Sequence, residues 1–124
     1  MDRLILEGDR GTHLIVDVMR SRTERMRGLL CRDGLASGHG LLIPNARSIH
    51  TFGMRFPIEV AFLDETMKVV AVRRMRPGRL GRPRIRARHV LECALGEGPS
   101  PEERLTVPVG ARAGADILIP APGR

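Results

Sequence analysis

The sequence predicts a mostly β protein with a minor α component: a compact β-sandwich or barrel-like single domain with one or two short helices. Three observations lead to this prediction. The chain has 124 residues, a length that suits one domain able to bury about two thirds of its unfolded surface. Short apolar runs recur along it, and several alternate apolar with polar residues. Glycines and prolines separate these runs, as they separate the strands of sandwiches and barrels.

The first two predicted elements are a strand and a helix. Residues 12–18, THLIVDV, place apolar side chains at every second position, which predicts a strand with one buried face. Residues 21–34, SRTERMRGLLCRDG, then predict a helix. Ser21 and Glu24 form a capping-box pattern at its start, and Gly34 is a suitable stop.

The middle of the chain predicts a short buried strand followed by a hairpin. GLLIP, residues 40–44, is an apolar run that ends at a proline. Only the short turn 64–67 separates the segment 48–64 from VVAV, residues 69–72. We therefore expect these two segments to pair as antiparallel strands.

The last third of the chain predicts two further strands and a second short helix. HVLECAL, residues 89–95, is a strand candidate, and ADILIP, residues 115–120, supplies the final strand. Between them, SPEERL carries a helix-start pattern, with Ser100 as the N-cap, Pro101 at the first position and Glu103 closing the capping box.

The segment 48–64, SIHTFGMRFPIEVAFLD, holds all three phenylalanines of the chain. Side chains of a strand alternate between its two faces, so this segment predicts an apolar face headed by His50. The residues that we expect to be buried on that face are Phe52, Phe56, Ile58, Val60 and Phe62. Thr51, Arg55 and Glu59 fall on the opposite, more polar face.

An unbroken strand would keep His50 and Glu59 on opposite faces and prevent them from acting as a pair. Gly53 and Pro57 are residue types that often mark bulges and bends in strands. We therefore predict a break near one of these two residues, which would bring His50, Thr51 and Glu59 into one pocket with Arg27. An arginine is a natural partner for a carboxylate on so apolar a segment, because burying the carboxylate unpaired is costly.

Three motifs of this sequence resemble a known family. RMRGLLCRDGL, GLLIPNARSIHTFGMRFPIEVAFLD and ARHVLECALG occur in the order and at the spacings of the domain of unknown function 192 family. The resemblance covers roughly residues 21–119. It implies a small, mostly β domain of a sandwich or barrel kind, often bacterial and sometimes exported, and it assigns no activity. The chain departs from the family pattern at Glu59, where an aspartate is common.

Five polar residues make up the candidate ligand site: His50, Thr51, Glu59, Arg27 and Arg32. His50 and Thr51 form the best polar pair in the sequence. Arg27 and Arg32 flank the predicted helix and are similar to family positions. The alternative roles are structural, with the histidine ring held by a backbone carbonyl and the guanidinium groups binding carbonyls or Glu59.

Two functions of different class fit these residues. The first is a small binding module that recognises an unknown polar small molecule, sugar or peptide. The second is a hydrolase-type enzyme in which His50 acts as general base and Glu59 orients it or acts as the acid. The binding module is favoured, because the sequence contains no recognisable activated nucleophile or metal site.

The charge of the chain raises a third function, weak binding of polyanions. The net charge is +7, from twenty arginines and one lysine against 14 acidic residues, and eight arginines lie in the stretch 73–88. We expect this stretch to be a mobile, exposed loop with at most weak, salt-sensitive affinity for polyanions. Nucleic acid is a disfavoured partner, although the charge does not exclude it, because the chain has no Trp or Tyr for stacking bases.

Metals, cofactors and membranes are not expected. No two of the four histidines have a metal-ligand spacing, and no nucleotide-binding fingerprint occurs. Cys31 and Cys93 are expected to be thiols, with a bridge between them left open. No apolar stretch approaches a membrane span, and the start of the chain does not read as a secretion signal, which favours a cytoplasmic location.

Overall fold

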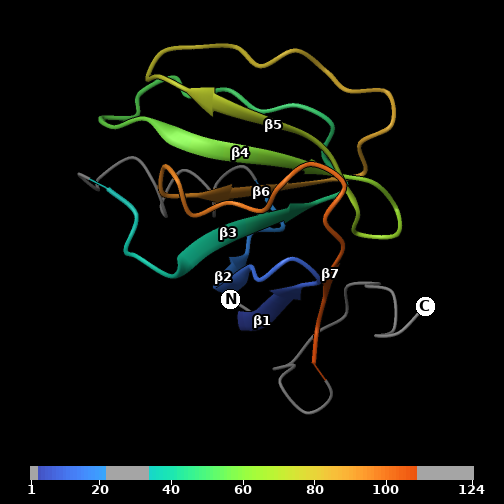
Figure 1. Ribbon diagram of the computed structural model, residues 1–124. Coiled ribbons are helices and arrows are strands. Elements are labelled where there is room, and N and C mark those ends of the chain that lie inside the picture. Colours follow the sequence, from blue (N-terminus) through green and yellow to red (C-terminus); the bar gives the residue numbers. More distant parts are fainter. Residues whose placement is uncertain (1–2, 22–33, 109–124) are drawn as a thin grey trace.

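In the computed structural model, which describes residues 3–21 and 34–108, the chain forms one seven-stranded sheet (Figure 1). The strands are β1 (Arg3–Gly8), β2 (His13–Val18), β3 (His39–Pro44), β4 (Ile58–Leu63), β5 (Val69–Met75), β6 (His89–Cys93) and β7 (Leu105–Thr106). Their order in the sheet is β5-β4-β6-β3-β2-β1-β7. Only β2 and β3 pair in parallel among these neighbours. The mostly β class is therefore confirmed.

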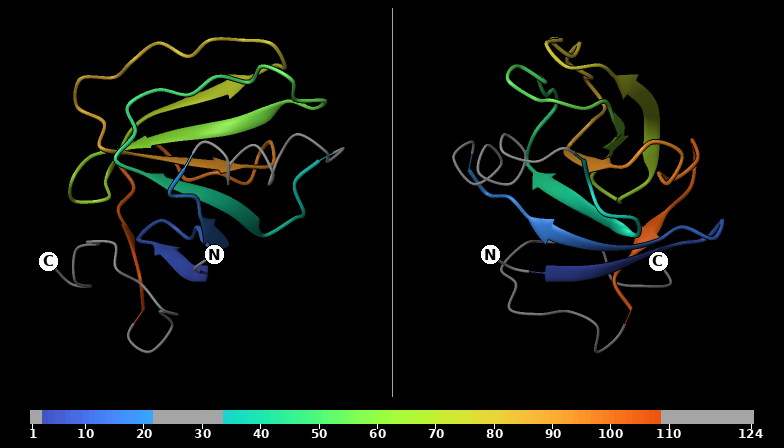
Figure 2. Two further views of the ribbon diagram at one scale, coloured as in Figure 1. Left: turned by 180° about the vertical axis from the view of Figure 1, so that it is seen from behind. Right: turned by 90° about the vertical axis from the view of Figure 1, so that its left-hand side faces the viewer.

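The sheet curls into a half-barrel, and the segment 102–105 joins its two edges at one end (Figure 2). At one edge β7 pairs with β1. At the other edge the Val69 N–H donates to the carbonyl of Glu103 at 2.8 Å, and the Glu102 N–H donates to the carbonyl of Val69 at 2.9 Å. The same short segment thus binds β5 at one edge of the sheet and β1 next to the other edge.

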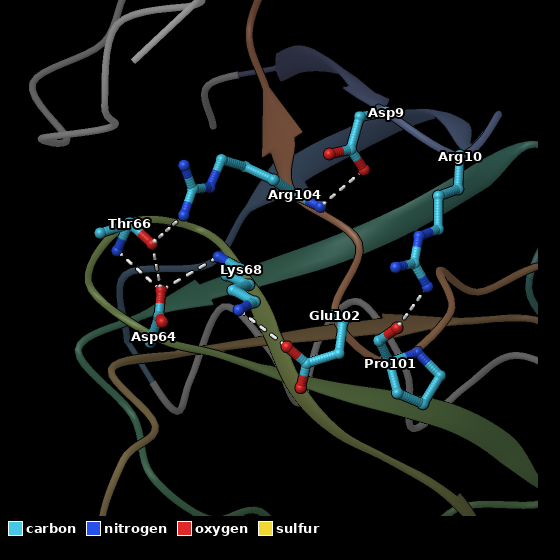
Figure 3. Close-up of polar contacts among 8 residues, drawn as sticks. All are labelled: Asp9, Arg10, Asp64, Thr66, Lys68, Pro101, Glu102 and Arg104. Carbon is cyan, nitrogen blue, oxygen red and sulfur yellow. Dashed lines mark hydrogen bonds and ion pairs between the residues drawn. The ribbon is translucent and has the colours of Figure 1, made fainter.

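Side chains reinforce this junction between the β4–β5 turn and the segment before β7 (Figure 3). Asp64 Oδ1 accepts hydrogen bonds from the Thr66 N–H at 2.8 Å and the Lys68 N–H at 3.0 Å, which fixes the turn. Lys68 Nζ lies 2.7 Å from Glu102 Oε2, and the Arg104 guanidinium lies 3.5 Å from Thr66 Oγ1. Turn and segment therefore hold each other in place.

The strand β4 is buried on both faces and separates two apolar layers. Its residues alternate between them, with Ala61 and Leu63 in the inner layer and Ile58, Val60 and Phe62 in the outer layer. The inner layer lies against β1 and β2 inside the half-barrel. The loops 45–57 and 76–88 lie over the outer layer (Figure 2). The polar face predicted for this strand is therefore wrong, because both faces are covered.

Four predicted strands are confirmed: those within 12–18, 40–44, 69–72 and 89–95. The hairpin of β4 and β5 is also confirmed, with Ala61 opposite Val72 in its register. The strands β1 and β7 were not predicted. The predicted final strand over 115–120 lies outside the described residues, and so does the predicted helix over 21–34 except for its two end residues.

The helix predicted to begin at Ser100 is wrong. The chain makes a turn there, with Glu102 in the left-handed region at φ 72°, and then enters β7. The Ser100 N–H does donate to Glu103 Oε1 at 2.9 Å, which is half of the predicted capping box. The same carboxylate also accepts hydrogen bonds from Thr12 and the Arg10 N–H. These tertiary bonds, and pairing of the next residues with β1, favour a turn over a helix.

The break predicted in the segment 48–64 is present. Strand β4 begins only at Ile58, and Gly53 lies in a turn with φ 80°. This turn ends the alternation, so Phe52 is 52% exposed and the prediction of its burial is wrong. Phe56 and the three even-numbered residues of β4 are buried as predicted.

Candidate functional site

His50 lies on the loop between β3 and β4, which crosses the outer layer. It forms an isolated β-bridge with Leu80 from the Arg-rich loop. Its ring stacks on the ring of Phe52 with the centroids 4.9 Å apart, and Nδ1 accepts the Phe52 N–H at 3.3 Å. The backbone and the neighbouring ring therefore fix the orientation of the imidazole.

A groove of about 440 Å³ opens beside His50, between the end of β2, the end of β3 and the loop that follows β3. That volume lies in the range of small-molecule sites, which is about 300–1,000 Å³. Its polar groups come from Arg20, Ser21, Asn45, Arg47, Ser48 and His50. Met19, Ile43 and Leu80 add apolar surface. The groove thus combines hydrogen-bonding groups with an apolar wall.

A buried histidine, His89, holds the backbone of Asn45, which lines the groove. Asn45 has a left-handed backbone, with φ 57°, and its N–H donates to His89 Nδ1 at 3.1 Å. Burial, together with the positive charge of Arg88, lowers the pKa of His89. The ring therefore stays neutral near pH 7, where Nδ1 can accept this hydrogen bond.

Thr51 is buried and fastens the Arg-rich loop to the His50 loop. Its hydroxyl donates to the carbonyl of Arg76 at 2.6 Å and accepts the Arg79 N–H at 2.8 Å. Its own N–H donates to the carbonyl of Arg79 at 2.8 Å, and its carbonyl accepts the Gly78 N–H at 2.8 Å. The hydroxyl is engaged inside the protein and positions the loop.

Glu59 is buried on the inner face of β4 and binds the loop that follows β6. Its carboxylate accepts the Gly96 N–H at 3.0 Å and the Gly98 N–H at 2.8 Å. The negative charge of this carboxylate also faces Arg74, whose Nε lies 3.8 Å from Glu59 Oε1.

The structure therefore separates the predicted site residues. His50 lines the groove on the outer side of β4, whereas Glu59 contacts the loop 94–98 on the inner side and does not line that groove. Thr51 supports the groove loop from behind. Arg27 and Arg32 lie outside the described residues. The predicted pairing of Glu59 with Arg27 or Arg32 is therefore not tested; within the described ranges, Arg74 on the neighbouring strand lies near the Glu59 carboxylate.

Comparison with a family model decides which family this sequence and fold belong to. The DUF192 model, described as "Uncharacterized ACR, COG1430", matches residues 4–102. This chain belongs to the DUF192 family. Both ends of this match lie earlier in the chain than those of the range suggested by the motifs, roughly 21–119. The match therefore includes most of β1.

Similar proteins extend this DUF192 assignment without adding an activity. A UPF0127 protein of Thermococcus sibiricus is 32% identical over 77 residues, which are 59% of this chain and 50% of that protein. The chain thus spans about half the length of that curated relative. A crystal structure from Sinorhizobium meliloti 1021, described as a proposed transcription regulator, has a TM-score of 0.61 at 22% identity, covering 86% of this chain and 92% of that one.

A second crystal structure, of a protein of unknown function from Novosphingobium aromaticivorans, has a TM-score of 0.67 at 17% identity. The match covers 83% of this chain and 82% of that one. At these identities the two structures show that the fold is shared, and they carry no further conclusion about the DUF192 domain described here.

Cys93 of the DUF192 domain is a buried free thiol. Burial, followed by the nearby charge of Glu59, raises the pKa of this thiol to about 12, so it is not a nucleophile at neutral pH. Cys31 lies outside the described residues. Within residues 3–21 and 34–108, no group of His, Cys, Asp and Glu is gathered as a metal site, and no helix has the length and apolarity to cross a bilayer. The cytoplasmic location stays a prediction.

The Arg-rich stretch of the DUF192 domain is part strand and part loop. Arg73 and Arg74 lie in β5, so the prediction of a loop is wrong for them. The rest follows the His50 loop closely, with the Gly81 N–H donating to the carbonyl of Ile49 at 2.8 Å. A side chain at residue 81 would collide with that carbonyl, since an added Cβ would lie 2.7 Å from it. The glycine therefore permits the close approach of the two loops.

Proposed function

We propose that this DUF192 domain is a small binding module whose groove beside His50 holds a polar small molecule, such as a sugar or a short peptide. The observation that carries the proposal is the groove itself, in which His50 and Arg47 face a space of about 440 Å³ with an apolar wall. Small-molecule sites commonly combine such an apolar wall with a few placed polar groups.

The enzyme hypothesis has less support. It needs His50 and Glu59 at one reacting group, but Glu59 is occupied by the amides of Gly96 and Gly98 on the other side of β4. A general acid or base must lie within hydrogen-bond reach of the atom it serves. A binding role asks only for the groups that line the groove.

A thermal-shift screen tests the proposal. A panel of uncharged monosaccharides, disaccharides and capped dipeptides is added to the domain, and binders are identified by a rise in Tm, since a ligand of the folded state stabilises it. We expect His50→Ala to abolish the rise for these binders. His13→Ala is the matched control, because His13 is exposed at the start of β2 and outside the groove. Equal losses in both variants, or none in either, would contradict the proposal.

A further inference from the structure

A second concave site lies on the other side of Leu80, between β5 and the loop after it. Its floor is formed by Phe62 of β4 with Arg73 and Met75 of β5, and its wall is the loop that follows β5. This loop arches over β5 in Figure 1. The cavity measures about 410 Å³ and, within the described residues, shares only Leu80 with the His50 groove.

The lining of this cavity is strongly basic. Its cationic residues are Arg73, Arg74, Arg76, Arg79, Arg82 and Arg84, and none of the described residues that line it is acidic. Arg74 is near a carboxylate, with its Nε 3.8 Å from Glu59. The other five guanidinium groups form no ion pair with a carboxylate of the described residues. Positive charge is therefore concentrated here, and among the described residues only Arg74 of the lining has a carboxylate near it.

The guanidinium of Arg84 is incompletely hydrogen-bonded among the described residues. Its guanidinium lies over the ring of Phe62, 5.4 Å from the centroid, which holds the group against the floor. Its Nε is buried and, among the described residues, has no hydrogen-bond acceptor. A buried donor that is left unsatisfied is costly. Arg84 lines the cavity, so its guanidinium charge lies close to any anion bound there.

The wall of the cavity is built before any ligand arrives. Thr51 holds the backbone at Arg76 and Arg79, and the Arg84 N–H donates to the carbonyl of Arg47 at 3.0 Å. Gly81 allows the loop to pack directly on Ile49. Holding like charges together costs energy in the free protein, and the fixed backbone lowers the cost of ordering them on binding.

From these observations we propose that the cavity binds a compact, multiply phosphorylated small molecule. Guanidinium groups donate paired hydrogen bonds to phosphate oxygens, and the arginines that line this cavity favour a ligand with several phosphate groups. The cavity has the size of a small-molecule site. Its one aromatic ring, Phe62, is 1% exposed and offers no face on which a nucleic-acid base could stack.

Titration calorimetry of the 124-residue domain with tripolyphosphate, inositol hexakisphosphate, ATP and orthophosphate tests the proposal. We expect saturable one-to-one binding of at least one multiply phosphorylated compound, about tenfold or more tighter than orthophosphate. Comparison of the first three compounds tells an inorganic chain from a phosphorylated ring or a nucleotide. Binding no tighter than that of orthophosphate would overturn the proposal.

Variants separate a built site from general basicity. Arg84→Gln and Arg79→Gln remove arginines that line the cavity, and each should weaken binding about tenfold. Arg86→Gln is the matched control, because it removes the same charge from the same loop but does not line the cavity. Circular dichroism checks that each variant is folded. Equal weakening by Arg86→Gln would show that net charge alone attracts the ligand and would overturn the proposal.

Leu80 and Ile85 are exposed beside these arginines, so an extended anionic partner is the alternative outcome. The same calorimetry with a single-stranded RNA oligomer, and sedimentation with phosphatidylserine vesicles, measures it. Tighter binding to either than to every phosphorylated compound, equally sensitive to Arg86→Gln, would identify an open basic surface and overturn the pocket. The neutral compounds of the groove screen do not probe this cavity. If phosphorylated compounds fail to bind, the proposed function of the groove is unaffected, and if the groove screen fails, the proposal for this cavity is unaffected.

Discussion

At the residue scale, the polar side chains of the HTFGMRFPIE motif are divided between the groove and the hydrogen bonds that hold neighbouring loops. His50 faces the groove, whereas Thr51 and Glu59 each hold a neighbouring loop by its backbone. Each of these two accepts amide N–H groups that would otherwise have to find a partner inside the protein. Residues that are close in the sequence thus have different structural roles, and their spacing along the chain did not reveal the difference.

The role assigned to Thr51 predicts a loss of stability on substitution. Thr51→Val keeps the shape of the side chain but removes the hydroxyl that binds Arg76 and Arg79. We expect a loss of about 1–3 kcal/mol in the free energy of unfolding, because buried partners are left unsatisfied. Urea unfolding measures it. Thr106→Val is the control, because the Thr106 hydroxyl donates a long hydrogen bond, 3.5 Å, to the carbonyl of Glu7. A similar loss of stability in Thr106→Val would contradict the role of Thr51.

At the element scale, β4 is a fully buried strand next to one edge of the sheet, and part of the segment that leads into it lines the groove. All six residues of β4 are buried, between β5 and β6 in the sheet and between two apolar layers across it. The turn at Gly53 lets the preceding residues leave this environment. One continuous motif therefore changes from a covering loop into a buried strand within a few residues.

Two phenylalanines of this motif provide a matched pair. Phe56 is 7% exposed in the outer layer and Phe52 is 52% exposed. We expect Phe56→Ala to cost about 3–5 kcal/mol of unfolding free energy, as for other buried phenylalanines. Phe52→Ala should cost under about 1 kcal/mol, because little apolar surface is uncovered. Equal losses in urea unfolding would contradict the assigned change of environment.

The segment before β7 makes a prediction about pH. Burial raises the pKa of Glu103, but hydrogen bonds from Ser100, Thr12 and Arg10 outweigh it and leave the pKa below the ordinary 4.5. Glu103→Gln should therefore cost about 2 kcal/mol or more at neutral pH. Because the folded pKa is depressed, the unfolded chain binds the proton first, and the stabilisation is lost as the pH falls below 4.5.

The difference between wild type and Glu103→Gln should therefore shrink in acid, as measured by urea unfolding at several pH values. Glu102→Gln is the matched control, because this neighbouring carboxylate is exposed and its ion pair with Lys68 is at the surface. Exposed ion pairs contribute about 1 kcal/mol or less. A difference for Glu103→Gln that stays constant from neutral to acid pH would contradict the account.

At the scale of the whole molecule, the sequence predicted the fold class better than the strands and contacts that link the two edges of the sheet. Alternation predicted β2, because it has an apolar face with a regular period, and the short turn 64–67 predicted that β5 pairs with the segment before it. β1 was missed since Ile5 interrupts that period, and β7 was missed since two residues hold no pattern. The helix-start pattern at Ser100 failed because Glu103 is claimed by long-range hydrogen bonds that local spacing does not contain.

The candidate site was predictable in part for the same reason. His50 stood out by its place at the head of the apolar run, and it does line the groove. The contacts of Glu59 depend on the loop 94–98, which is 35 or more residues away in the sequence. The basic cavity needed the folding of the Arg-rich loop back onto β5, whereas the sequence showed only a concentration of arginines.

The most direct test of the proposed binding module is a map of the ligand on the protein. Amide ¹H–¹⁵N spectra are recorded while the best uncharged compound from the thermal-shift screen is added. The account predicts that the shifted amides cluster in residues 19–21 and 43–50, which line the groove with His50, and that His50→Ala removes the shifts. Shifts centred on the loop 94–98 around Glu59, or unchanged in His50→Ala, would contradict it.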